Sequence, residues 1–141
     1  LADHFEKILA VEISKLSIKT AKHNARANDI RNLSFVRMSS EELTQAIDGI
    51  RPFRRLKNIN LNEFNFSTVL VDPPRSGLDP TTISLILRYK TIIYFSCNPL
   101  TLEQNLIGIL PTHKIAAAAV FDQFPWTDHL EIGLVLEAQR N

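Results

Sequence analysis

The chain has 141 residues, which is the length of a single domain and is enough to bury a hydrophobic core. Its 16 basic and 15 acidic side chains nearly cancel, so any binding of nucleic acid must come from local basic patches. The single cysteine excludes an intramolecular disulfide, the histidines lack metal-ligand spacing and no apolar run is long enough to span a membrane, so we expect a cytoplasmic protein without a metal.

Apolar, β-branched runs alternate with helical segments along the chain. Strands are predicted at residues 7–13, 33–37, 67–71, 91–95, 114–121 and 132–136. Helices are predicted at residues 15–28 after the N-cap Ser14, from Ser39 to near Gly49, at 80–89 and at 101–110, whereas residues 49–66 show no clear period. This alternation predicts an α/β fold with parallel strands and helices on both faces of the sheet.

The last strand is expected to run in the opposite direction. Only residues 122–130 separate it from the strand before it, whereas a parallel crossover usually takes about a dozen residues or more. An antiparallel strand begins at the edge where the parallel strands end. Glu131, which stands just before residues 132–136, should therefore lie on the same edge as Cys97, which follows residues 91–95.

Four chemically active side chains are predicted to share that edge: Glu12, Asp72, Cys97 and Glu131. Ligands and catalytic groups collect outside the carboxyl ends of strands in open α/β sheets. Each residue also has a simpler explanation, because strand-end carboxylates often cap helices and free cysteines usually pack in the core. The convergence of all four on one edge favours a functional site.

Several motifs resemble the RNA uracil-5-methyltransferase family, and within it the branch that acts on tRNA. They are Val11–Lys15, the Asp-Pro-Pro-Arg-Ser-Gly-Leu-Asp run at 72–79, Ser-Cys-Asn-Pro at 96–99, and Phe-Asp-Gln-Phe-Pro at 121–125 with His-Leu-Glu at 129–131. The resemblance extends over essentially the whole chain. It implies a Rossmann-like class I methyltransferase sheet, mostly parallel with an antiparallel C-terminal strand.

The resemblance also implies a reaction and a role for each site residue. S-adenosyl-L-methionine would supply a methyl group to C5 of a uridine in the T loop of tRNA, forming ribothymidine. Cys97 would attack C6 of the uracil and form a covalent adduct, and Glu131 would remove the C5 proton. Glu12 and Asp72 would contact the cofactor. The uridine must be flipped out, and Phe124 and Trp126 are candidates for stacking on bases, although packing is the simpler role for both.

Two groups of basic residues are candidates for contact with RNA. One group shares a predicted helix face, for which a solvated outer surface is the simpler interpretation: Lys15, Lys19, Lys22 and Arg26. The other surrounds Phe53 with no acidic residue nearby in the sequence: Arg51, Arg54, Arg55 and Lys57. Phosphate contact and an ordinary surface loop remain equally open for this second group.

The family's first strand and glycine-rich cofactor turn have no counterpart in the chain. We therefore expect residues 1–141 to be a partial catalytic domain, a C-terminal fragment that is inactive by itself. The parent enzyme is expected to be a monomer, and the fragment to self-associate through exposed strand edges. Three other functions remain open: a ribosomal-RNA uracil-5-methyltransferase, a thiol hydrolase using Cys97 with His129, and a non-catalytic nucleotide-binding module.

Overall fold

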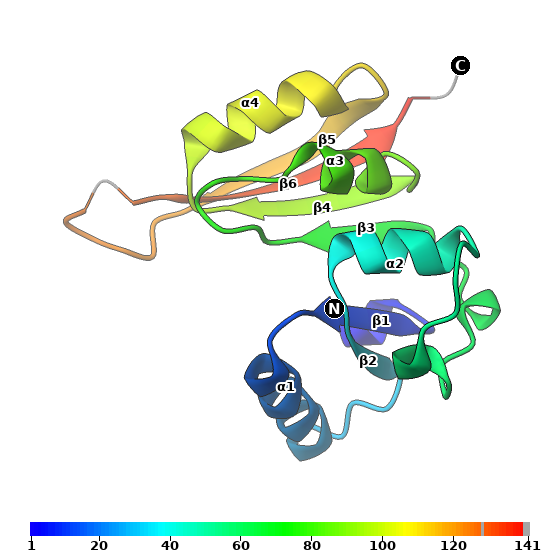
Figure 1. The fold of residues 1–141 in the computed structure, drawn as a ribbon. Helices are drawn as coiled ribbons and strands as arrows, with labels where there is room; N and C mark the ends of the chain where they lie inside the picture. Colours follow the sequence, from blue (N-terminus) through cyan, green and yellow to red (C-terminus); the bar gives the residue numbers. More distant parts are fainter. Residues whose placement is uncertain (128, 140–141) are drawn as a thin grey trace. The chain divides into compact units, whose positions relative to one another are not determined.

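The computed structural model describes residues 1–127 and 129–139, and the chain divides into two compact units, Leu1–Asn65 and Phe66–Asn141. Both units combine strands and helices, as Figure 1 shows. No helix in the described part of the chain is long and apolar enough to cross a membrane.

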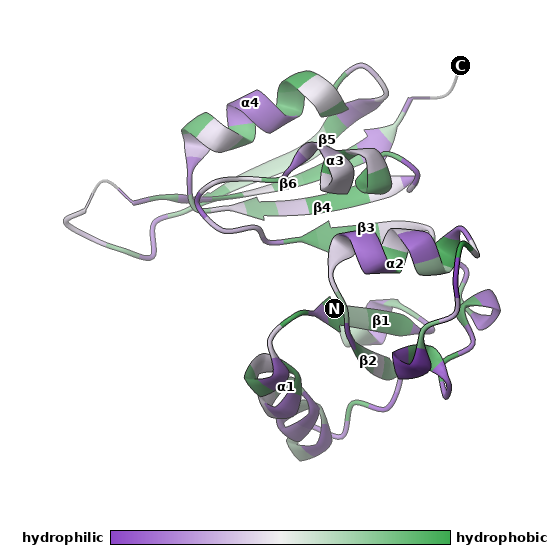
Figure 2. Ribbon diagram, in the orientation of Figure 1, coloured by the Kyte–Doolittle hydropathy of each residue, from purple (hydrophilic) through white to green (hydrophobic). Residues whose placement is uncertain are grey.

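The first unit is built on two parallel strands joined by a helix. Its elements are η1 (Ala2–His4), β1 (Ile8–Glu12), α1 (Lys15–Ala27), β2 (Leu33–Arg37), α2 (Ser40–Ile47), η2 (Arg54–Leu56) and η3 (Leu61–Glu63). Figure 2 shows α1 mainly in hydrophilic colours and β1 mainly in hydrophobic ones. The four basic side chains of α1 are exposed, which agrees with a solvated outer face.

Local side-chain chemistry fixes where the helices of the first unit begin and end. The Ser14 hydroxyl accepts a hydrogen bond from the Ser17 N–H at 3.2 Å and so caps α1. Ser39 and Glu42 form a reciprocal capping box at the start of α2. Gly49 follows α2 with a φ of 66°, the left-handed conformation that ends a helix and that glycine adopts without strain.

The second unit is a four-stranded sheet in the order β3-β4-β6-β5 with two helices packed on it. β3 and β4 are parallel, whereas β6 runs antiparallel to both of its neighbours, β4 and β5. The predicted reversal of the C-terminal strand is therefore confirmed. The elements are β3 (Thr68–Val71), α3 (Pro80–Ile86), β4 (Thr91–Ser96), α4 (Pro99–Ile109), β5 (His113–Phe121) and β6 (Glu131–Ala138).

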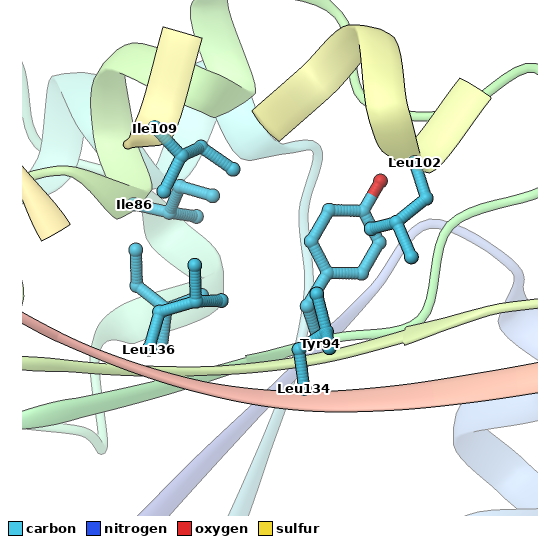
Figure 3. Packing of buried hydrophobic residues seen from close by; sticks show 7 residues of the cluster. Ile86, Tyr94, Leu102, Ile109, Leu134 and Leu136 are labelled. Carbon is cyan, nitrogen blue, oxygen red and sulfur yellow. The ribbon is translucent and has the colours of Figure 1, made fainter. Parts of the chain in front are cut away.

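The core of the second unit lies between the sheet and these two helices. Figure 3 shows Ile86 of α3 and Leu102 and Ile109 of α4 facing Tyr94, Leu134 and Leu136 of the sheet. Along β4 the buried positions alternate with partly exposed ones. Because one cluster contains residues of both helices, α3 and α4 cover the same face. The expectation of helices on both faces is not met within this unit.

The predicted elements are found, with shifted boundaries. α4 begins at Pro99 rather than at residue 101, because the Asn98 side chain accepts a hydrogen bond from the Leu100 N–H and caps the helix. A proline in the first turn loses nothing, since its missing N–H would have no partner inside the helix. α3 is shorter than predicted and ends at Ile86 rather than at residue 89.

Candidate functional site

The carboxyl edge of the second unit carries three of the four predicted site residues. Asp72 follows β3, Cys97 follows β4, and Glu131 is the first residue of β6. Ser96 pairs with Ile132 in the antiparallel ladder, so extending the register by one residue places Cys97 opposite Glu131. Residues directly opposite each other in such a pair have Cα atoms only about 4.5–5.5 Å apart. By this extension Cys97 and Glu131 occupy neighbouring backbone positions just past the last pair of the ladder.

Hydrogen bonds fix the turn that carries Cys97. The buried Ser96 hydroxyl donates to the Asn98 carbonyl oxygen at 3.1 Å and accepts from the Asn98 N–H at 3.2 Å. These two contacts close the chain around Cys97, whose partly exposed side chain is a free thiol. The partial positive charge at the amino end of α4 begins two residues further on, and it stabilises negative charge near the turn.

The loop between β3 and α3 is tied to the same turn through the main chain of Arg75. The Arg75 carbonyl oxygen accepts a hydrogen bond from Nδ2 of Asn98 at 3.0 Å. It also lies 3.1 Å from the hydroxyl of Thr101 in the first turn of α4. Arg75 immediately follows Asp72, Pro73 and Pro74. The exposed Asp72 carboxylate therefore belongs to a loop that is anchored to the turn carrying Cys97.

Asn105 of α4 anchors the far end of this loop. Its Oδ1 accepts from the Leu78 N–H at 2.8 Å and from the Tyr94 hydroxyl at 2.7 Å, and its Nδ2 donates to the Leu78 carbonyl oxygen at 3.1 Å. Burial raises the pKa of Tyr94 to about 12, so its hydroxyl stays neutral and can donate. Gly77 lies against this amide with a φ of 77°, and a Cβ added there would stand 2.7 Å from Asn105 Oδ1.

The sequence interpretation did not include Asn105 or Tyr94. Two signals were available: an amide in the middle of a predicted helix, and a hydroxyl within a run of buried apolar residues. Both types of group need partners when they are buried. What the sequence does not reveal is that each is the partner of the other.

The loop between β5 and β6 borders the site. Nη1 of Arg75 lies 3.5 Å from Nδ1 of His129, and the Phe124 ring meets the His129 ring edge-on with centroids 6.3 Å apart. Within the described part of the chain, His129 contacts Arg75, Phe124 and the Thr127 hydroxyl rather than Cys97. Nothing in this geometry favours a Cys–His hydrolase.

Glu12 lies in the first unit, at the carboxyl end of β1 as predicted. Its side chain is exposed, and Oε1 accepts a hydrogen bond from the Ser14 N–H at 2.7 Å. This contact ties the carboxylate to Ser14, the residue that caps α1, which is a local structural role. A carboxylate has two oxygens and accepts several hydrogen bonds, so this contact does not prevent Glu12 from also binding ribose hydroxyls.

The basic group around Phe53 is partly engaged within the first unit. Arg51 stacks over the Phe53 ring with its guanidinium carbon 4.4 Å from the ring centroid. Arg55 donates to the Arg37 carbonyl oxygen at 2.6 Å and forms an ion pair with Glu42. Hydrogen bonds from the Ser39 main chain and from Arg55 lower the pKa of Glu42. The sequence neighbourhood of this group did not indicate an acidic partner, but the fold brings Glu42 of α2 to Arg55 from 13 residues away along the chain.

The remaining polar features of the first unit do not form a second site. A depression of about 570 Å³ is lined by residues near the amino-terminal ends of β1 and β2, opposite the end of β1 that carries Glu12, and by residues between 57 and 64. Its charges are partly paired, since Lys7 Nζ lies 2.9 Å from Glu63 Oε2. Among the described residues no group of three or more His, Cys, Asp or Glu side chains could hold a metal ion.

Residues 1–139 match the family of tRNA (Uracil-5-)-methyltransferases. The chain belongs to this family. Two relatives named tRNA/tmRNA (uracil-C(5))-methyltransferase support the assignment: the Cellvibrio japonicus protein is 55% identical over 97% of the chain, and the Saccharophagus degradans protein is 54% identical over 96%. The chain spans about 37% of the length of these curated relatives.

Solved structures of other methyltransferases share the fold of this chain. The tRNA (uracil-54, C5)-methyltransferase of Pyrococcus abyssi, in complex with S-adenosyl-L-homocysteine, superimposes with a TM-score of 0.72 at 26% identity, over 96% of this chain and 30% of that one. An rRNA methylase of Streptococcus thermophilus shares the fold with a TM-score of 0.64 at 11% identity, over 99% of this chain and 78% of that one. The predicted class I methyltransferase fold is confirmed.

Proposed function

We propose that the chain carries the catalytic residues of an S-adenosylmethionine-dependent methyltransferase that methylates C5 of a uridine in the T loop of tRNA. The observation that carries the proposal is the placement of Cys97 opposite Glu131 at the carboxyl edge of the sheet. The family assignment and the names of the relatives support the reaction and the substrate. Because the chain spans only part of the length of its relatives, the activity is proposed for the protein that contains these residues together with the remaining segments.

The reaction divides between the two residues. C5 of uracil is a poor nucleophile, so the Cys97 thiolate adds to C6 and moves electron density to C5 and O4. When bound, S-adenosylmethionine would supply the methyl group to C5 as an electrophile, and its methyl–sulfur bond would break to leave S-adenosylhomocysteine. Glu131 accepts the C5 proton, the C5–C6 double bond forms again, and the thiolate is expelled from C6. A nucleophile and a base at neighbouring positions suit this addition and elimination at adjacent carbons.

The residues present also fit the cofactor. Two exposed carboxylates stand at the carboxyl ends of strands, Glu12 after β1 and Asp72 after β3. Carboxylates accept hydrogen bonds from ribose hydroxyls and pair with ammonium groups, and S-adenosylmethionine carries both. We therefore propose Glu12 and Asp72 as cofactor contacts.

Covalent capture of an RNA hairpin tests the proposal. In T-arm RNA with 5-fluorouracil at the target position, fluorine at C5 cannot leave as a proton does, so the Cys97 adduct should persist in the presence of S-adenosylmethionine. The Cys97→Ala variant should give no adduct. The Glu131→Gln variant should form an adduct even with ordinary uracil, because its methylated intermediate cannot lose the proton. The chain and the full-length protein that carries it are assayed side by side.

Two results would contradict the proposal. Adduct formation that persists in Cys97→Ala would exclude this thiol as the nucleophile. Transfer of labelled methyl groups to a ribosomal-RNA hairpin in preference to the T-arm hairpin would replace the tRNA substrate with the ribosomal one.

A further inference from the structure

Trp126 is the most exposed of the large hydrophobic side chains that the structure describes, at 103%. It lies on the loop between β5 and β6, which extends beyond the edge of the sheet in Figure 1. A tryptophan in this state buries none of its large apolar surface against the described part of the chain. Its contribution to folding therefore cannot come from packing.

The backbone conformation at Trp126 is a second feature that disfavours a tryptophan at this position. The Thr127 N–H donates to the Phe124 carbonyl oxygen at 3.2 Å, Pro125 holds the second position of this turn, and Trp126 holds the third with a φ of 69°. These are features of a type II turn, whose third position favours glycine or asparagine. A tryptophan there carries backbone strain that glycine would avoid. Within the described part of the chain, fold stability thus explains neither the side chain nor the conformation that presents it.

The position of the loop relates Trp126 to the proposed chemistry. The loop leaves β5 at Phe121, which pairs with Glu131 in the ladder. Three residues after Trp126, the loop carries His129, whose Nδ1 is 3.5 Å from Nη1 of Arg75. The main chain of Arg75 is bonded in turn to the Asn98 side chain, next to Cys97. The loop that carries the exposed indole is therefore attached next to Glu131 through Phe121. Through His129 and Arg75 it also approaches the turn that carries Cys97.

We propose that Trp126 stacks on an unpaired base of the RNA loop that carries the target uridine. This inference rests on the proposed function, in which a uridine flips out of a folded loop and leaves neighbouring bases without their stacking partners. A planar indole in solvent offers those bases a replacement surface, and such stacking tolerates any base because each has a π face.

The chain has one tryptophan, so its fluorescence reports on this residue alone. Titration with a T-arm hairpin RNA should quench the emission of Trp126 and protect it from acrylamide, whereas a blunt duplex of the stem sequence should do neither. In anisotropy titrations with labelled hairpin, Trp126→Ala should weaken binding roughly 5- to 150-fold, the range expected for losing one stacked base, and Trp126→Phe should lose less. Ile107→Ala, which removes a side chain 74% exposed on α4, is the matched control and should bind normally.

Trp126→Gly separates binding from folding. It should lose RNA affinity as Trp126→Ala does, with a melting temperature equal to or above that of the parent chain, because glycine relieves the strain at this φ. A lower melting temperature of both Trp126→Ala and Trp126→Gly would show that the indole supports the fold, and this would overturn the inference. RNA binding and Cys97 adduct formation with unchanged Trp126 emission would overturn it as well and leave the proposed function intact. If the full-length protein that carries these residues neither bound the RNA nor formed the adduct, both proposals would fall.

Discussion

Replacing Gly77 by alanine tests whether the loop that carries Asp72 and Arg75 is held rigidly against α4. Alanine at a φ of 77° costs roughly 1–2 kcal/mol, because its Cβ approaches the following carbonyl oxygen. The new Cβ would also stand 2.7 Å from Asn105 Oδ1. Three hydrogen bonds hold that amide, so it must give up at least one, at about 0.5–1.5 kcal/mol each. With one hydrogen bond lost, we expect a total loss of about 1.5–3.5 kcal/mol in the free energy of unfolding.

Gly49 provides the matched control. Its φ is 66°, and a Cβ added there meets nothing within 4 Å, so Gly49→Ala should cost only the backbone share, about 1–2 kcal/mol. Urea unfolding followed by circular dichroism measures the losses, and hydrogen exchange of peptides from each unit assigns them. In an Asn105→Ala background only Thr101 Cβ stays close to the new Cβ, at 3.2 Å, so the excess loss of Gly77→Ala over Gly49→Ala should shrink. An equal loss of unfolding free energy for Gly77→Ala and Gly49→Ala in the parent chain would refute the idea that the Asn105 side chain is held rigidly in place.

Three further predictions follow from single contacts. In a Tyr89→Phe variant, absorbance titration should show Tyr94 ionising near pH 12; because its pKa is raised from 10, the stability it contributes is complete below pH 10 and is lost as the pH rises toward 12. The side chain of Asp79 caps α3, and hydrogen bonds from the hydroxyl and then the N–H of Thr82 lower its pKa. The stability that Asp79 contributes is therefore present above pH 3.8 and is lost on further acidification. Asp79→Ala should cost about 0.5–2 kcal/mol of unfolding free energy at pH 7 and remove this pH dependence in thermal melts. If the exposed Arg54 contacts a phosphate, Arg54→Ala should lower the slope of log Kd against log salt by about 1, whereas Trp126→Ala should leave that slope unchanged.

The sequence predicted the secondary structure well because the signals are local. The caps at Ser14 and Ser39 and the helix stop at Gly49 depend on side chains within a few residues of each helix end. The short connection at 122–130 likewise determined that β6 is antiparallel, since chain length alone excludes a parallel crossover. The boundary of α4 was missed because Asn98 and Pro99 were interpreted as a turn, although they also start a helix.

The sequence by itself determined the family, the order of strands and helices, and the edge on which Asp72, Cys97 and Glu131 stand, because each depends on the order of residues along the chain. Only the tertiary structure decided which groups meet. The register of β4 and β6, extended by one residue, sets Cys97 opposite Glu131, and Asn105 joins Leu78 to Tyr94 across 27 and 11 residues of sequence. The pairing of Arg55 with Glu42 is of the same kind. Such contacts arise from the packing of distant segments, and no local pattern specifies the partner of a polar side chain.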